Sequence, residues 1–147
     1  MSLKIILASH GKFALAALQT AEMIIGNSQE QVTVISVTPG RTYDECLAEL
    51  QTIYQQYQKP GQEVLILVDI YGGTPANIST YLTLTAENVQ VYSGLNLPVL
   101  MELLLSKPEN LADAKKIVNE IGQNVMTDIT AASKKEVDNN GDQMDSY

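Results

Sequence analysis

The 147-residue chain has little of what several protein classes depend on. Its single cysteine, Cys46, cannot form a disulfide within the chain, so a reducing compartment such as the cytoplasm is expected. We expect Cys46 to pack on a helix as a small apolar residue. No apolar run approaches the roughly 20 residues of a membrane-spanning helix. The N-terminus also lacks the pattern of a secretory signal peptide.

Positive charge and metal ligands are scarce as well. Lysine and arginine total 9 against 17 acidic residues, which gives a net charge of −8. Duplex nucleic acid and anionic membranes are bound through basic residues, so both are disfavoured as partners. The acidic balance is compatible with a basic protein partner, or with solubility alone. With one histidine, one isolated cysteine and no acidic cluster at ligand spacing, no metal site is expected.

Strand and helix patterns alternate along one domain. Continuous apolar runs predict strands at Leu3–Ala8, Val32–Val37, Glu63–Asp69 and Val89–Tyr92. Helical periodicity predicts helices at Gly11–Ile25, Thr42–Pro60, Thr74–Ala86 and Val99–Leu105, and a last helix that Asn110 is expected to cap. This alternation predicts an α/β fold that is doubly wound, with a mostly parallel sheet and helices on both faces.

Local signals predict where helices begin and where the domain ends. Thr42 and Glu45 form a capping-box pattern, and Thr74 precedes Pro75 as a candidate cap. The run Val125–Ala132 is interpreted as a short strand. We therefore expect one domain over residues 1–132 and a polar, mobile tail over residues 133–147.

Two polar side chains stand where neighbouring apolar strands end. His10 follows the first strand and Asp69 ends the third. In a sheet of order 2-1-3-4, the crevice where strand order reverses lies between these two strands, and ligands bind there. A carboxylate that holds one imidazole nitrogen leaves the other free to act as a base or a nucleophile. The sequence therefore predicts a site built on His10 and Asp69.

The loop after Asp69 adds features suited to an anion. Gly72 and Gly73 permit backbone conformations that other residues avoid, and Thr74 opens a helix whose N–H groups favour negative charge. Gly11 lies at a second helix start. A phosphoryl group carries roughly −1.5 to −2 charge at neutral pH. Since these motifs contain no lysine or arginine, backbone donors would hold that charge.

Other interpretations of the same residues stay open at this point. His10 can simply bond a backbone carbonyl, and the two glycines with Thr74 can be a turn and a cap. A Ser-His-Asp hydrolase would need Ser9 or Thr74 aligned on His10, but Ser9 is adjacent to His10, and adjacent strand residues face opposite sides. A receiver domain phosphorylated on Asp69 would want more carboxylates after the first strand for magnesium.

Three runs together resemble one protein family: Ser9–Gly11, Leu67–Asn77 and Ser93–Leu100. They are similar to the IIA component of the mannose family of the bacterial phosphoenolpyruvate-dependent sugar phosphotransferase system, and the likeness covers about residues 2–125. The resemblance implies phosphorylation of His10 on Nε2, with Asp69 as its partner carboxylate. Thr74 corresponds to the hydroxyl of the family's Gly-Gly-Ser/Thr-Pro motif.

The resemblance also implies partners and an assembly. The phosphoryl group would come from the carrier HPr and pass to a IIB component, while the membrane subunits IIC and IID would be engaged only indirectly. The family has a parallel sheet of order 2-1-3-4 and exchanges a C-terminal strand in a homodimer, a role that Val125–Ala132 would fill. Because no Ala/Pro-rich linker follows, a free-standing IIA component is expected.

The expected function is therefore that of a phosphotransferase acting through a phosphohistidine, with no cofactor, metal or nucleotide. One alternative is a regulatory binding module that signals through the phosphorylation state of His10. Another is a domain that binds an anion without a covalent step. The sequence does not indicate which sugar would be transported.

Overall fold

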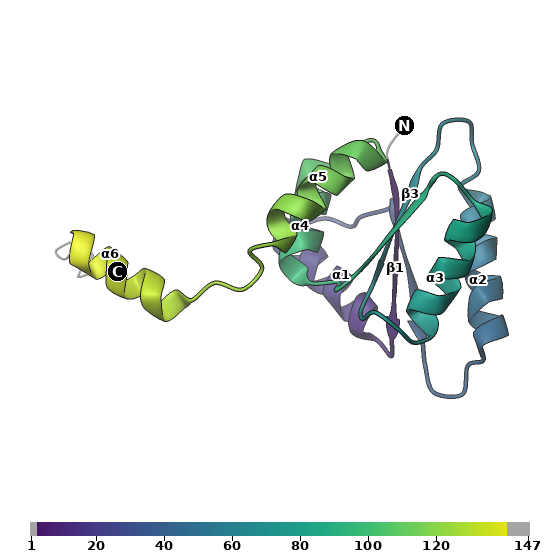
Figure 1. Ribbon diagram of the computed structural model, residues 1–147, viewed down its shortest axis with the longest axis horizontal. Helices are drawn as coiled ribbons and strands as arrows, with labels where there is room; N and C mark the ends of the chain where they lie inside the picture. The colour runs from purple at the N-terminus through teal and green to yellow at the C-terminus, as the bar shows by residue number, and fades with distance from the viewer. Residues whose placement is uncertain (1–2, 141–147) are drawn as a thin grey trace.

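The computed structural model describes residues 3–140, which form a sheet with helices on both sides and a separate C-terminal helix (Figure 1). The strands are β1 Lys4–His10, β2 Val32–Val37, β3 Val64–Val68 and β4 Val89–Ser93. The helices are α1 Phe13–Ile25, α2 Tyr43–Gln56, α3 Thr74–Thr85, α4 Leu97–Ser106, α5 Leu111–Gly122 and α6 Ile129–Asn140.

The sheet has the predicted order, β2-β1-β3-β4, and every pairing in it is parallel. The last pair between β1 and β3 joins Ala8 to Val68. Beyond that pair, β1 continues along β2 as far as His10, opposite Val37. The end of β1 and the residue after β3 therefore meet at the carboxyl edge of the sheet, where the strand order reverses.

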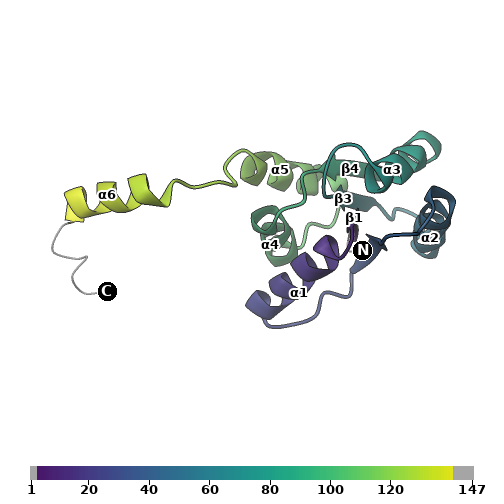
Figure 2. The ribbon, with the colours of Figure 1, turned by 90° about the horizontal axis from the view of Figure 1, so that it is seen from below.

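Two apolar cores lie on opposite faces of the sheet, because successive side chains of a strand alternate in direction. Ile5 and Leu7 of β1 belong to the core covered by α1, α4 and α5. Ile6 and Ala8 belong to the core covered by α2 and α3. Figure 2 shows the sheet between these two groups of helices. The same alternation places His10 on the α2/α3 face.

Side-chain caps set several helix starts. The Thr42 hydroxyl accepts the Glu45 backbone N–H at 3.2 Å, and the Glu45 carboxylate bonds the Thr42 hydroxyl at 3.1 Å. Asn110 accepts the Asp113 N–H at 2.8 Å, which confirms that predicted cap. Asn96 caps α4 in the same way, so this helix begins two residues before the predicted Val99.

The strand predicted at Val125–Ala132 is wrong. This stretch is a loop followed by the first turn of α6, where the Asp128 carboxylate accepts the Ala131 N–H at 2.9 Å. The cap and the alanine-rich turn favour a helix, and α6 extends away from the sheet (Figures 1 and 2). Residues 133–140 of the predicted tail are helical, residues 141–147 lie outside the described residues, and the mobility of the tail stays a prediction.

None of the helices within residues 3–140 combines the length and the apolar character that crossing a bilayer requires.

Candidate functional site

His10 and Asp69 meet at the carboxyl edge of the sheet, as their places in the sequence predict. Oδ2 of Asp69 lies 2.8 Å from Nδ1 of His10 and also accepts the His10 backbone N–H at 2.9 Å. The His10 side chain is 47% exposed, whereas that of Asp69 is 12% exposed. The largely buried carboxylate thus holds the imidazole on its inner side, and much of the ring is open to solvent.

The ionisation of Asp69 decides which ring nitrogen carries the proton. Burial raises the pKa of Asp69, but hydrogen bonds from the His10 backbone N–H and the His10 ring outweigh it, and the net pKa lies below the ordinary value. Asp69 is therefore ionised at neutral pH and can only accept hydrogen bonds. It follows that Nδ1 of a neutral His10 donates its proton to Asp69, and that the lone pair lies on Nε2.

The two glycines of the following loop have left-handed backbones, with φ of 95° at Gly72 and 84° at Gly73. Gly73 is the cap position of α3, and its carbonyl accepts the Asn77 N–H. Here the sequence prediction needs correcting, because Thr74 is the first helical residue and its side chain makes no capping bond. A threonine inside the first turn cannot reach the N–H groups that a residue before the helix caps.

Thr74 nevertheless stays at the site. It opens α3 directly after Gly73, and within residues 3–140 its hydroxyl has no hydrogen-bond partner. The start of α3 therefore offers a hydroxyl and unpaired backbone N–H groups near His10. Helix N-termini of this kind favour anions.

The turn after β1 separates the roles of Ser9 and His10. Ser9 is fully buried, and its hydroxyl accepts the Ala14 N–H at 2.8 Å, which satisfies a donor in the first turn of α1. Because Ser9 is buried and its hydroxyl bonds the start of α1, Ser9 cannot serve as the nucleophile of a Ser-His-Asp hydrolase. Gly11 has φ of 56° and donates its N–H to the Val37 carbonyl, while Lys12 is exposed.

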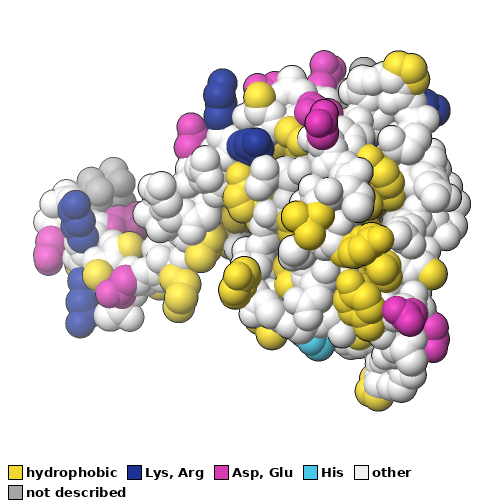
Figure 3. All heavy atoms as spheres, turned by 45° about the vertical axis from the view of Figure 1, so that its right-hand side comes forward, with side chains coloured by type: hydrophobic (Ala, Val, Ile, Leu, Met, Phe, Trp, Pro, Cys, Tyr) yellow, Lys and Arg dark blue, Asp and Glu magenta, His cyan; other side chains and the backbone are white. Residues whose placement is uncertain are grey.

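Exposed apolar side chains near His10 were not singled out by the sequence analysis. Tyr71 is 93% exposed, Ile70 57% and Phe13 52%, and each lies within three residues of Asp69 or His10. Figure 3 shows the histidine at the surface with hydrophobic side chains exposed nearby. The sequence did offer a signal for these exposed side chains, because two apolar residues, Ile70 and Tyr71, directly follow the site carboxylate Asp69. We call Phe13, Ile70 and Tyr71 the apolar rim.

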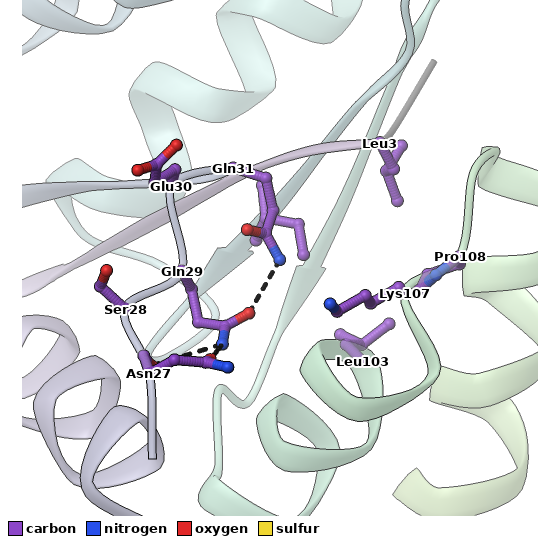
Figure 4. A pocket seen from close by; sticks show the side chains of 10 residues that line it. Leu3, Asn27, Ser28, Gln29, Glu30, Gln31, Leu103, Lys107 and Pro108 are labelled. Atoms are coloured by element: carbon purple, nitrogen blue, oxygen red, sulfur yellow. Dashed lines mark hydrogen bonds between the residues drawn. The ribbon is translucent and has the colours of Figure 1, made fainter. Parts of the chain in front are cut away.

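A separate cavity of about 440 Å³ lies at the opposite end of the strands (Figure 4). Leu3, just before β1, and Ile5 of β1 line it, together with the loop before β2 and the end of α4. Its amides are paired with one another, since Gln29 bonds both Asn27 and Gln31. This cavity is not part of the histidine site. Within residues 3–140, no group of three or more His, Cys, Asp or Glu side chains is placed to hold a metal.

The fold and the site define a doubly wound α/β domain built around a carboxylate-paired histidine at its switch point. A family model described as the PTS system fructose IIA component matches residues 4–122. The chain belongs to this family, the IIA components of the mannose family of the sugar phosphotransferase system.

Named relatives support the same family assignment. The mannose-specific EIIAB component of the PTS of Escherichia coli K12 is 33% identical over 117 residues, which cover 75% of this chain and 33% of that protein. This chain thus spans about a third of that relative's length. The fructose-specific EIIA component of Bacillus subtilis is 33% identical over 122 residues, covering 81% of this chain and 79% of that protein.

Solved structures show the same fold. The mannose/sorbose-specific IIA subunit from Enterococcus faecalis superposes with a TM-score of 0.78 at 30% identity, covering 86% of this chain and 94% of that one. A PTS IIA protein associated with the fucose utilization operon of Streptococcus pneumoniae gives a TM-score of 0.76 at 30% identity, covering 90% and 98%.

Proposed function

We propose that this protein takes a phosphoryl group from phospho-HPr onto Nε2 of His10 and passes it to a IIB component during coupled sugar uptake and phosphorylation. One observation carries the proposal: Nδ1 of His10 bonds an ionised Asp69 at 2.8 Å, which leaves the Nε2 lone pair as the nucleophile. Membership of the family supports a phosphocarrier as donor and a IIB component as acceptor.

The transfer balances without a metal ion or a nucleotide. The Nε2 lone pair of His10 forms a bond to phosphorus as the bond from phosphorus to the donor histidine nitrogen breaks, and that nitrogen keeps the electron pair. The His10 ring becomes cationic, and its Nδ1 proton stays in the hydrogen bond to Asp69. In the second transfer the N–P electrons return to Nε2 as the phosphoryl group passes to IIB.

Asp69 and the start of α3 stabilise opposite charges of the phosphorylated histidine, the carboxylate the positive ring and the helix start the negative phosphoryl group. Asp69 stabilises the cationic ring, a charge-assisted hydrogen bond that is worth about 1.5–3 kcal/mol. The phosphoryl oxygens would be held by backbone N–H groups at Gly72 and Gly73 and by the Thr74 hydroxyl, whereas the N–H of Gly11, which the sequence also offered for this role, is donated to the Val37 carbonyl. In such a reaction the protein contributes mainly position and electrostatics.

Two successive protein partners must reach the same nitrogen. We propose that they dock on the apolar rim, since exposed aromatic and aliphatic side chains at the centre of an interface provide most of its binding energy. The membrane subunits IIC and IID are then engaged only through IIB, and the protein works in the cytoplasm. The named relatives are components specific for mannose, fructose or sorbose, so the sugar is left unassigned.

A homodimer is part of the proposal and involves the C-terminal segment. Met126, in the loop before α6, is 92% exposed, and Ile129 and Val137 are 73% and 44% exposed on α6, which extends away from the sheet (Figure 2). Light scattering on the full chain and on a truncation ending at residue 124 tests this. A dimer that becomes a monomer on truncation supports it, and a monomeric full chain at high micromolar concentration contradicts it.

The experiment for the main proposal uses the first enzyme of the pathway, HPr and phosphoenolpyruvate. Wild type is expected to gain one acid-labile phosphoryl group by intact mass, and His10→Ala none. The variant keeps the backbone N–H that bonds Asp69, so it should fold, which circular dichroism checks. A label on His10→Ala equal to that of wild type overturns the assignment. A label that no IIB component accepts favours the regulatory binding module instead.

A further inference from the structure

Gly73 lies so close to the His10 ring that the ring occupies the space where a side chain of residue 73 would begin. A Cβ atom built on Gly73 would stand 2.8 Å from both Cε1 and Nε2 of His10. This is closer than carbon atoms pack in proteins, so no side chain fits there while the ring keeps its place. Gly73, the cap residue of α3, thus lies beside Nε2, the nitrogen that the proposed function phosphorylates.

The adjacent glycine behaves differently. Gly72 has a similar left-handed φ, 95° against 84° at Gly73, but a Cβ built on it meets nothing within 4 Å. Backbone conformation alone is thus a reason for glycine at both positions. Space for the His10 ring is a reason at Gly73 only.

The ring is therefore bounded on two sides by one short segment. Asp69 holds Nδ1 at 2.8 Å, and Gly73, four residues later, lies against the ring at Cε1 and Nε2. A methyl group on Gly73 must displace either the start of α3 or the ring. The ring is the more mobile, because it turns about its own side-chain bonds, whereas Gly73 is tied into α3 through its bond from Asn77. Turning the ring breaks the Nδ1 bond to Asp69.

We propose that Gly73 is a positioning residue: its lack of a side chain lets the His10 ring lie with Nδ1 on Asp69 and Nε2 toward the start of α3. The consequence for phosphoryl transfer rests on the proposed function, but the ring position itself does not. The role differs from holding the phosphoryl group through a backbone N–H.

The first test measures the tautomer of the His10 ring and needs no transfer reaction. The chain has one histidine, so ring-¹⁵N labelling with long-range proton–nitrogen spectra reports His10 alone. In wild type and in Gly72→Ala, we expect the Nδ1–H form bonded to Asp69. In Gly73→Ala, we expect a mixture of tautomers with averaged nitrogen shifts. Gly72→Ala controls for the left-handed backbone. Unchanged shifts in a folded Gly73→Ala, or equal changes in both variants, overturn the proposal.

The second test measures transfer from phospho-HPr in a single turnover. Gly73→Ala should take up phosphate roughly ten- to a hundredfold more slowly, the loss expected with one charge-assisted hydrogen bond. Gly26→Ala is the matched control, because Gly26 has φ of 98° with open space at the far end of α1, and its rate should equal that of wild type.

A double variant shows whether Gly73 acts through the Asp69 bond. If it does, Gly73→Ala should slow a protein that already carries Asp69→Asn far less than it slows wild type. Fully additive losses overturn this account of Gly73. If wild type itself takes up no phosphate, the proposed function fails, while the nitrogen spectra still decide the position of the ring.

Discussion

Oδ2 of Asp69 accepts two hydrogen bonds from one residue, the backbone N–H of His10 at 2.9 Å and its ring Nδ1 at 2.8 Å. One carboxylate oxygen thus fixes both where β1 ends and how the imidazole is turned. The first bond is structural and survives any substitution of His10 other than proline. The second depends on the imidazole and links the fold to the proposed chemistry.

Asp69→Asn should separate charge from shape. The amide oxygen can still accept a hydrogen bond, but the negative charge that stabilises a cationic ring is gone. We expect uptake of the phosphoryl group from phospho-HPr to slow by roughly ten- to a hundredfold, measured by rapid quench. Asp138→Asn, which removes an exposed charge on α6, is the control. Equal rates for wild type and Asp69→Asn would remove Asp69 from the mechanism.

Acid should weaken the fold through Asp69. Its native pKa is lowered below the ordinary value, so its charged form stabilises the folded state above that value, and this stability is lost as the pH falls through the native pKa. Urea unfolding from pH 7 down to pH 3 should therefore show wild type losing more stability than Asp69→Asn below about pH 4. A stability difference that does not change with pH would contradict this.

Cys46 should be unreactive while the protein is folded. The thiol is fully buried in the core under α2, and burial raises its pKa. Only the thiolate attacks thiol reagents, so modification by a disulfide reagent at pH 8 should be slow in the native protein and fast in denaturant. Native reaction as rapid as that of the unfolded chain would show that the α2 core is open.

Tyr71→Ala should weaken docking without altering the ring. Tyr71 is 93% exposed beside the site, so its loss leaves the core intact. We expect the KM for phospho-HPr to rise by about tenfold, the cost of a central aromatic contact, with little change in kcat. Leu84→Ala, at an exposed residue near the far end of α3, should change neither constant. A Tyr71→Ala variant with unchanged KM would exclude Tyr71 from the interface.

Much of the fold could be predicted because the physical signals are local. Strands buried on both faces give continuous apolar runs, and the second strand was predicted with its observed bounds, Val32–Val37. The pairing of His10 with Asp69 followed from topology, since parallel strands end at one edge. The predictions over Val125–Ala132 and at the Thr74 cap failed, because a short apolar run and a threonine before proline each fit two local structures.

Contacts between distant residues could not be predicted. The sequence shows that two glycines follow Asp69, but not that Gly73 lies against the ring of His10 while Gly72 faces open space. Nor does it show that Ser9 satisfies the first turn of α1. Such contacts depend on the packing of separate elements, which spacing along the chain does not encode.

The most direct test of the central claim is to phosphorylate ring-¹⁵N-labelled protein and to locate phosphorus on its single histidine by nitrogen–phosphorus coupling. The account predicts a proton on Nδ1 before the reaction and phosphorus on Nε2 after it, with the Nδ1 proton retained. Phosphorus on Nδ1, or on a residue other than His10, would contradict it.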